Sequence, residues 1–176
     1  MQRIWLVSDT HFNHTNIIKY TNRPFLDAES MNHALICNWN NVVAPDDIVF
    51  HLGDVGLFRY PDQAKTIIQQ LNGKKILIYG NHDRRKWDWI DIGFIAAQRG
   101  PLKFQQYLFS HKPLIPSQNP DTLINIHGHI HDKTSLFEWQ INISVEQTNY
   151  TPVQLMTGGY DEEKEEPKQI NYSRNY

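Results

Sequence analysis

One arrangement, repeated in the first half of the chain, limits the fold more than any other feature. A short apolar run that indicates a buried strand ends directly at a polar loop. The three runs are residues 3–8, 47–51 and 75–79. Between them, Asp27 is a potential N-cap for a helix over residues 27–43, and Pro61 opens a second helix over residues 62–71. Strands and helices that alternate in this way form parallel βαβ units, whose loops meet at the carboxyl edge of the sheet.

The second half leaves little room for helices. Its candidate strands are residues 94–97, 102–105, 106–110, 123–126 and 136–145. These short segments favour antiparallel pairing. The fold expected for the whole chain is α/β, with two packed mixed β-sheets flanked by helices in a four-layer sandwich. Residues 1–159 are predicted to form a single domain, and residues 160–176 a polar C-terminal tail.

Composition excludes several classes of protein. The formal net charge of −2 argues against duplex nucleic acid as a partner, since its binders usually present a basic face. No run approaches the length of a membrane span, and the chain begins with a core strand instead of a signal peptide. Cys37 is the lone cysteine, which excludes an internal disulfide, and we interpret it as a small buried apolar residue. A cytoplasmic protein without a membrane partner is therefore expected.

Five segments in a fixed order carry side chains that bind metals. They are Asp9-Thr10-His11, Gly53-Asp54, Gly80-Asn81-His82-Asp83, His111 and Gly128-His129-Ile130-His131. Each segment alone is common, and the alternative is a chance cluster of polar loop residues. Their order, their places beside predicted strands and their mixed oxygen and nitrogen ligands together favour two adjacent divalent metals.

The same segments resemble the calcineurin-like metallophosphoesterase family, whose pattern is D-x-H, G-D, G-N-H-[D/E], H and G-H-x-H. The match runs from Asp9 to His131, and the segment Asn22-Arg23-Pro24-Phe25 resembles one seen in small prokaryotic and phage members of the family. The resemblance implies a first metal bound by Asp9, His11 and His131. It implies a second metal bound by Asn81, His111 and His129. Asp54 would bridge both ions, and His82 would stand beside the leaving group without binding metal.

Chemistry supports these roles. A carboxylate has two oxygens and can therefore bridge two cations, which an imidazole cannot. Two metals about 3.5–4 Å apart can share a hydroxide that attacks phosphorus in line. An imidazole can act as a general acid near neutral pH, and His82, beside the ligand candidate Asn81, is the best placed histidine to protonate the leaving group. The expected activity is hydrolysis of a small phosphate diester or monoester, with nucleotides among the candidates. Mn²⁺ is the leading cofactor, and Fe²⁺, Zn²⁺ and Ni²⁺ also suit the ligands.

One departure from the family concerns the partner of His82. Members of the protein phosphatase branch carry an acid three residues after the bridging Asp, followed by an arginine. Here those positions are Leu57 and Phe58, and Asp83 cannot be assumed to substitute. This argues against a phosphoprotein phosphatase and leaves open what orients His82.

Residues outside the motifs have weaker indications. His14 is a candidate for contact with substrate phosphate or proton donation, and Arg23 for contact with a phosphate oxygen. The alternatives are a solvated histidine and a surface ion pair. Trp87 and Trp89 either stack a nucleobase or, as we favour, pack against the sheet or a subunit. His51 is expected to satisfy a hydrogen bond in the core.

Three other functions compete with a phosphoesterase. One is a scaffold of the same fold that has lost catalysis and binds a partner protein, which the complete ligand set disfavours. Another is a nuclease, although nucleases of this family usually carry further domains. A single-zinc hydrolase would leave Asn81 and a bridging Asp54 without a purpose. The predicted partner is a small phosphorylated substrate, and exposed aromatic residues in the second half are compatible with a homodimer.

Overall fold

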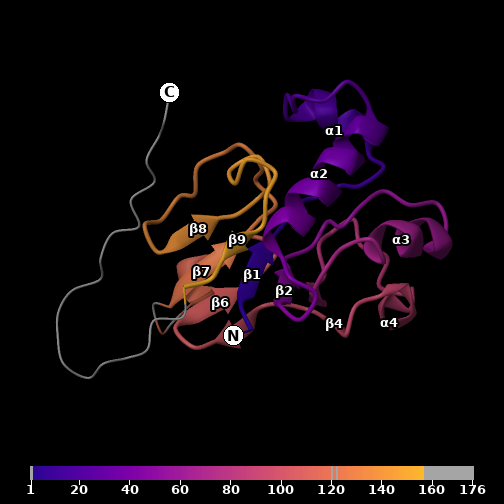
Figure 1. Cartoon of the computed structure of the whole chain (residues 1–176). Coiled ribbons are helices and arrows are strands. Elements are labelled where there is room, and N and C mark those ends of the chain that lie inside the picture. The colour runs from indigo at the N-terminus through magenta and orange to yellow at the C-terminus, as the bar shows by residue number, and fades with distance from the viewer. Residues whose placement is uncertain (1, 120, 122, 157–176) are drawn as a thin grey trace.

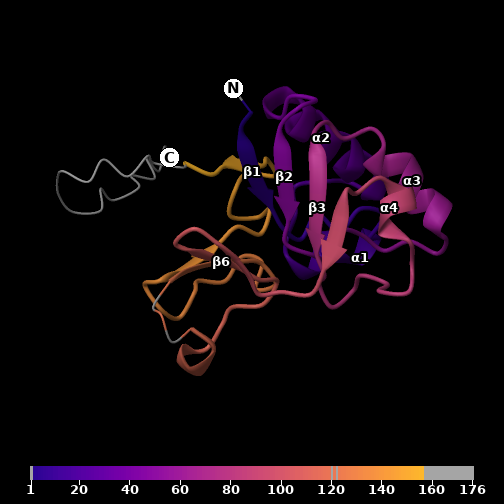
Figure 2. The ribbon, with the colours of Figure 1, turned by 90° about the horizontal axis from the view of Figure 1, so that it is seen from below.

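The computed structural model describes residues 2–119, 121 and 123–156, and the predicted tail over residues 160–176 lies outside them. The first of two sheets has the spatial order β4-β3-β2-β1-β9. Figure 1 labels β4, β2, β1 and β9 of this sheet. Its strands are β1 (Ile4–Val7), β2 (Ile48–His51), β3 (Lys74–Ile78), β4 (Ala96–Gln98) and β9 (Val153–Gln154). The first four run parallel, and β9 pairs antiparallel with β1. The parallel units predicted for the first half are confirmed, and Figure 2 shows β1, β2 and β3 side by side.

The α-helices of the described chain all precede β4. They are α1 (Thr15–Tyr20), α2 (Ala28–Val42), α3 (Pro61–Ile68) and α4 (Trp89–Ile92). As predicted, Asp27 caps α2: its carboxylate accepts from the Ser30 N–H at 2.8 Å. The interpretation of Cys37 as buried is wrong, because α2 buries Met31, Leu35 and Trp39 and so turns Cys37 toward solvent.

The second sheet has the order β5-β6-β7-β8. Its strands are β5 (Leu102–Phe104), β6 (Tyr107–Phe109), β7 (Ile124–His127) and β8 (Gln140–Asn142). Only β5 and β6 pair antiparallel, whereas β6, β7 and β8 run parallel, so the expected antiparallel pairing is largely wrong. The physical reason is the length of the connections. The connections between β6 and β7 and between β7 and β8 are long enough to return the chain to the starting end of the sheet, as parallel strands require.

Alternating side chains of the first sheet serve two separate cores. Trp5 and Val7 join the core that contains buried residues of the four helices, whereas Leu6 and Phe50 join the core against the second sheet. Accordingly, β6, β7 and β8 lie on one side of β1 and β2 in Figure 1, and α3 and α4 on the other. The predicted α/β fold with two packed mixed sheets is confirmed. Within the described residues no helix is both long and apolar enough to cross a membrane.

A buried carboxylate fixes the end of the first sheet that lies opposite the metal-ligand loops. Asp47 accepts hydrogen bonds from the Arg3 N–H at 3.0 Å, the Trp5 Nε1–H at 2.8 Å and the Ala44 N–H at 3.0 Å. The Arg3 guanidinium lies 3.1 Å from the same carboxylate. Burial alone would raise the pKa of Asp47, but these donors and the Arg3 charge hold that pKa well below its usual range.

We expect Asp47→Asn to lower the free energy of unfolding at pH 7 by about 2–3 kcal/mol, because buried donors lose a charged acceptor. The depressed pKa means that the carboxylate stabilises the fold above its unfolded pKa of about 3.9 and loses this effect as the pH falls below it. The deficit should therefore persist at about pH 5 and shrink in urea titrations between about pH 4 and pH 2. Asp46→Asn is the matched control, since Asp46 is exposed and lies 3.8 Å from the Lys74 ammonium. Equal stability of wild type and Asp47→Asn at pH 7 would contradict the prediction.

Candidate metal centre

The five metal-ligand segments meet at the carboxyl ends of β1, β2, β3, β6 and β7. Backbone hydrogen bonds join them. The Asp9 N–H donates to Gly53 O at 3.0 Å, and the Gly128 N–H donates to His111 O at 2.9 Å. The segments were predicted from separate stretches of sequence, and the fold brings them to one place.

The backbone at this place is strained. Most of the predicted ligands adopt a left-handed conformation that residues other than glycine rarely take: Asp9 (φ 59°), His11 (φ 50°), Asp54 (φ 56°), His129 (φ 71°) and His131 (φ 52°). Such conformations persist only where the surrounding structure enforces them, and they concentrate at functional sites. The strain turns side chains from successive loop residues toward a common centre.

Two glycines allow the loops to approach closely. A Cβ on Gly80 would collide with the Asp54 side chain, and a Cβ on Gly128 would collide with Ser8 and the Asp9 carboxylate. The glycines of the Gly-Asn-His-Asp and Gly-His-x-His segments therefore make room for the carboxylates of the site.

A first cluster consists of Asp9, His11 and His131, whose ligand atoms all lie within 4.8 Å of one another. Asp9 Oδ2 accepts from the His129 N–H at 2.8 Å and the Ser144 hydroxyl at 3.0 Å. Asp9 Oδ1 and His11 Nε2 are buried without a hydrogen-bond partner. Such orphaned lone pairs are costly unless a cation binds them.

A second cluster consists of Asp54, His111 and His129, again within 4.8 Å. His111 Nδ1 lies 2.9 Å from the Leu52 carbonyl, which can only accept, so Nδ1 carries the proton and Nε2 offers a lone pair. That Nε2 is 2.9 Å from Asn81 Oδ1 and 3.2 Å from His129 Nδ1. Asn81 thus joins this cluster, which then offers four potential ligand atoms.

Asp54 lies between the two clusters. Its Oδ2 is 3.6 Å from His11 Nε2 and 3.4 Å from His111 Nε2, while its Oδ1 accepts from the His82 N–H at 2.8 Å. One oxygen therefore faces both clusters, which differs from the expectation that bridging would use both oxygens. Burial alone would raise the pKa of Asp54. Without a metal, however, His111 can hold a second proton on Nε2, and the hydrogen bond and charge of that protonated ring keep the pKa of Asp54 well below its usual range. The orphaned atoms and the mixed oxygen and nitrogen donors fit two divalent cations.

The sequence contains no motif that indicates Glu146, which the structure places behind the first cluster. Its Oε1 lies 3.1 Å from His131 Nδ1 and so leaves Nε2 of this histidine for a metal. Burial alone would raise the pKa of Glu146, but the His131 hydrogen bond and the Arg23 charge lower it to about 2. A carboxylate in this position orients a ligand histidine and makes it a stronger base.

We expect Glu146→Gln to weaken metal binding at the first cluster by about 10- to 100-fold, the usual effect of losing such a partner. The measurement is a titration of metal-free protein with Mn²⁺, which gives a separate affinity for the first and for the second cluster. The matched control is Glu138→Gln, which changes an exposed carboxylate. Identical binding curves for Glu146→Gln and wild type would show that Glu146 does not support the ligand.

The structure corrects the interpretation of Arg23 as a phosphate ligand. Its Nε and one terminal nitrogen donate to Glu146, the latter at 2.7 Å, and that nitrogen also donates to Asp9 O at 2.7 Å. The other nitrogen donates to Thr10 O at 2.9 Å and to Met31 Sδ. All five N–H groups are thus used inside the protein. Because the side chain is fully buried, the alternative of a surface ion pair is wrong too. Arg23 holds the Asp9 loop and Glu146 together.

His82 and His14 lie at the rim of the centre. The exposed His82 ring has its centroid 5.5 Å from that of His11 and 6.3 Å from that of His14. His14 is half-buried, with Nδ1 3.2 Å from His11 Nδ1. Both rings line a pocket of about 400 Å³ beside His129 and His131. These positions are compatible with the predicted roles in proton donation and substrate contact.

Asp83 does not orient the His82 ring. Its Oδ2 accepts from the Asp54 N–H at 2.9 Å and the Gly80 N–H at 2.7 Å, and its Oδ1 accepts from the Val55 N–H at 3.0 Å. The carboxylate therefore ties the second and third ligand loops together. Asp83 is therefore not the partner that the His82 ring lacks at position 57.

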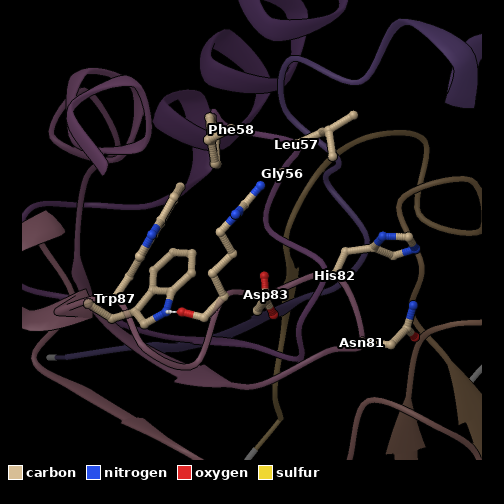
Figure 3. Close-up of a pocket in the computed structure, with 9 residues that line it drawn as sticks. Gly56, Leu57, Phe58, Asn81, His82, Asp83 and Trp87 are labelled. Carbon is tan, nitrogen blue, oxygen red and sulfur yellow. Dashed lines mark hydrogen bonds between the residues drawn. The ribbon is translucent and has the colours of Figure 1, made fainter. Parts of the chain in front are cut away.

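Two other predictions concern residues near the centre. His51 is buried, accepts from the Gly53 N–H at 3.2 Å and donates through Nε2 to the Thr10 hydroxyl at 2.9 Å, so its role in the core is confirmed. Trp89 is buried in the helical core, as favoured. Trp87 is half-buried and lines a separate pocket of about 300 Å³, with His82 at the opposite end (Figure 3).

The fold and the site define the class of protein. The chain belongs to the calcineurin-like phosphoesterase family, whose model matches residues 2–171, so the predicted resemblance is confirmed. Family membership and the two clusters together indicate a metal-dependent hydrolase.

Relatives of the chain extend this result. An uncharacterized protein of Methanocaldococcus jannaschii is 40% identical over 169 residues, covering 88% of each chain. A crystal structure of a protein of unknown function from Aquifex aeolicus has a TM-score of 0.70 and 25% identity, covering 88% of this chain and 96% of that one. The nuclease MPE of Pseudomonas putida shares the fold, with a TM-score of 0.53, 21% identity and coverage of 74% and 62%.

Proposed function

We propose that this protein is a two-metal phosphoesterase that hydrolyses a small phosphate diester or monoester. The observation that carries the proposal is the position of Asp54 Oδ2, 3.6 Å from His11 Nε2 in one cluster and 3.4 Å from His111 Nε2 in the other. A single anionic oxygen between two sets of ligands suits a pair of adjacent cations better than one isolated ion.

Two divalent ions bound there would supply an activated water nucleophile and positive charge for the phosphoryl oxygens. The protein's own residues would hold and orient the reacting groups. Asp9, Asp54 and Asn81 contribute oxygens, while His82 reaches the open side of the centre and would donate a proton to the leaving oxygen. His14 would contact the phosphate from the neighbouring wall of the same pocket.

The test compares metal-free protein with protein loaded separately with Mn²⁺, Fe²⁺, Zn²⁺ or Ni²⁺. We expect no hydrolysis without metal, and turnover of bis-p-nitrophenyl phosphate or p-nitrophenyl phosphate with Mn²⁺, at two ions per chain by native mass spectrometry. The ratio of the two rates separates a diesterase from a monoesterase. Folded protein that binds two ions and cleaves neither compound nor any nucleotide would contradict the proposal and favour a partner-binding scaffold.

A further inference from the structure

A second pocket adjoins the metal centre on the side of Asn81 and His111. It has a volume of about 320 Å³, and those two residues are part of its wall. Three cations line it as well: Arg85, Arg99 and Lys112. They come from different segments, namely the loop after β3, the β4–β5 connection and the residue that follows His111. We call this cavity the cationic pocket.

The positive charge of the cationic pocket is not balanced locally. Within residues 2–119, 121 and 123–156, the side chains of Arg85, Arg99 and Lys112 form no salt bridge, although other lysines and arginines do. The lining among these residues contains no aspartate or glutamate. All three side chains are exposed and free to meet a ligand. In a chain with a formal charge of −2, three unpaired cations around one cavity form a distinct anion-attracting feature.

The pocket near Trp87 offers less to a ligand. There the Arg84 guanidinium already lies over the Trp87 ring, 5.3 Å from its centroid, and Phe58 is buried. One face of the Trp87 ring is thus already covered by the protein itself. The cationic pocket, in contrast, presents unused donors directly beside the second cluster.

We propose that the cationic pocket binds a second phosphate group of the substrate, next to the one that is cleaved. This inference rests on the proposed function, and it narrows the substrate to nucleotides or strands with adjacent phosphates. Arginine fits phosphate because its planar guanidinium can donate two parallel hydrogen bonds, and lysine adds a compact charge. Asn81 and His111 belong to both the metal centre and this pocket, so one molecule can reach both.

The test measures binding, so it does not depend on turnover. Mn²⁺-loaded protein is titrated by calorimetry with thymidine 3′,5′-bisphosphate, thymidine 5′-monophosphate and thymidine 3′-monophosphate. We expect the bisphosphate to bind at least about tenfold more tightly than either monophosphate, since one hydrogen bond to a charged group accounts for about that factor. In the triple variant Arg85→Gln/Arg99→Gln/Lys112→Gln, the affinity for the bisphosphate should exceed that for the monophosphates by less than about threefold. Lys74→Gln, a charge change at the opposite end of the sheet, should retain the wild-type ratio.

Equal affinities for the three nucleotides in wild type would overturn the inference, as would a gain that survives in the triple variant. The second phosphate could be one that links two nucleotides or a free terminal one, and a bisphosphate with its 3′-phosphate methylated distinguishes the two. A retained gain supports an internucleotide phosphate, and a gain confined to the free phosphate supports a terminal one. Hydrolysis of bis-p-nitrophenyl phosphate by the same preparations tests the proposed function separately, so either can fail alone.

Discussion

Asp54→Asn should lower kcat/KM for bis-p-nitrophenyl phosphate by at least about a thousandfold, equivalent to ~4 kcal/mol of lost transition-state stabilisation. It should also reduce the bound metal to fewer than two ions per chain. The asparagine can keep its Oδ1 on the His82 N–H, as Asp54 does at 2.8 Å. Its amide nitrogen then replaces Oδ2 and presents N–H donors to both clusters, where cations need lone pairs.

Because the hydrogen bond to His82 N survives in Asp54→Asn, the fold should be retained, and circular dichroism would check this. Asp91→Asn is the matched control, since Asp91 is exposed and pairs only with Lys65 among the described residues, at 3.0 Å. If Asp54→Asn protein binds two ions tightly and turns over at a near wild-type rate, the prediction that both ions share the Asp54 carboxylate is wrong.

His82→Gln should lower kcat by about 10²-fold or more for a diester with an alkyl or nucleoside leaving group, the usual range for loss of a general acid. The loss should be small for bis-p-nitrophenyl phosphate, because p-nitrophenolate leaves without a proton. Metal content should not change, since His82 approaches Asp54 through its backbone N–H and its ring is exposed. The dependence on leaving group distinguishes proton donation from positioning.

His33→Gln, a change of an exposed histidine on α2, is the control for this experiment. His14→Gln tests the neighbouring ring, whose centroid is 6.3 Å from that of His82. If His14→Gln shows the dependence on leaving group and His82→Gln does not, the proton comes from His14. An equal loss for both leaving groups in His82→Gln would mean that His82 positions the substrate.

Much of the fold follows from local sequence. The sequence runs that form β1, β2 and β3 are short and apolar, and each ends directly at a polar loop, which is the pattern of a buried strand. Parallel pairing was predictable there because helices separate these strands. In the second half, strands of three or four residues carry little pattern, and the parallel pairing of β6, β7 and β8 depends on long connections. Local sequence does not show whether a long connection returns the chain to the starting end of the sheet, and this decides between parallel and antiparallel pairing.

The same distinction applies to the candidate site. Its ligand candidates were found from sequence because each belongs to a compact segment with its own chemistry. The supporting roles were not. Arg23 was singled out from sequence for phosphate contact and Glu146 was not indicated at all, because the two form a buried pair across 123 positions of sequence. The exposure of Cys37 was missed for a similar reason, since only the packing of α2 decides which side of the helix faces the sheet.

The sequence by itself thus determined the chemistry: which loops carry oxygen and nitrogen ligands, which strands deliver them, and which family the chain resembles. These properties are encoded within a few neighbouring residues. Only the tertiary structure decided that Asp54 Oδ2 stands between the clusters, that Glu146 supports His131, and that unpaired cations surround a cavity beside Asn81. Such relations depend on distances between segments far apart in the chain, and those distances are set when the two cores pack.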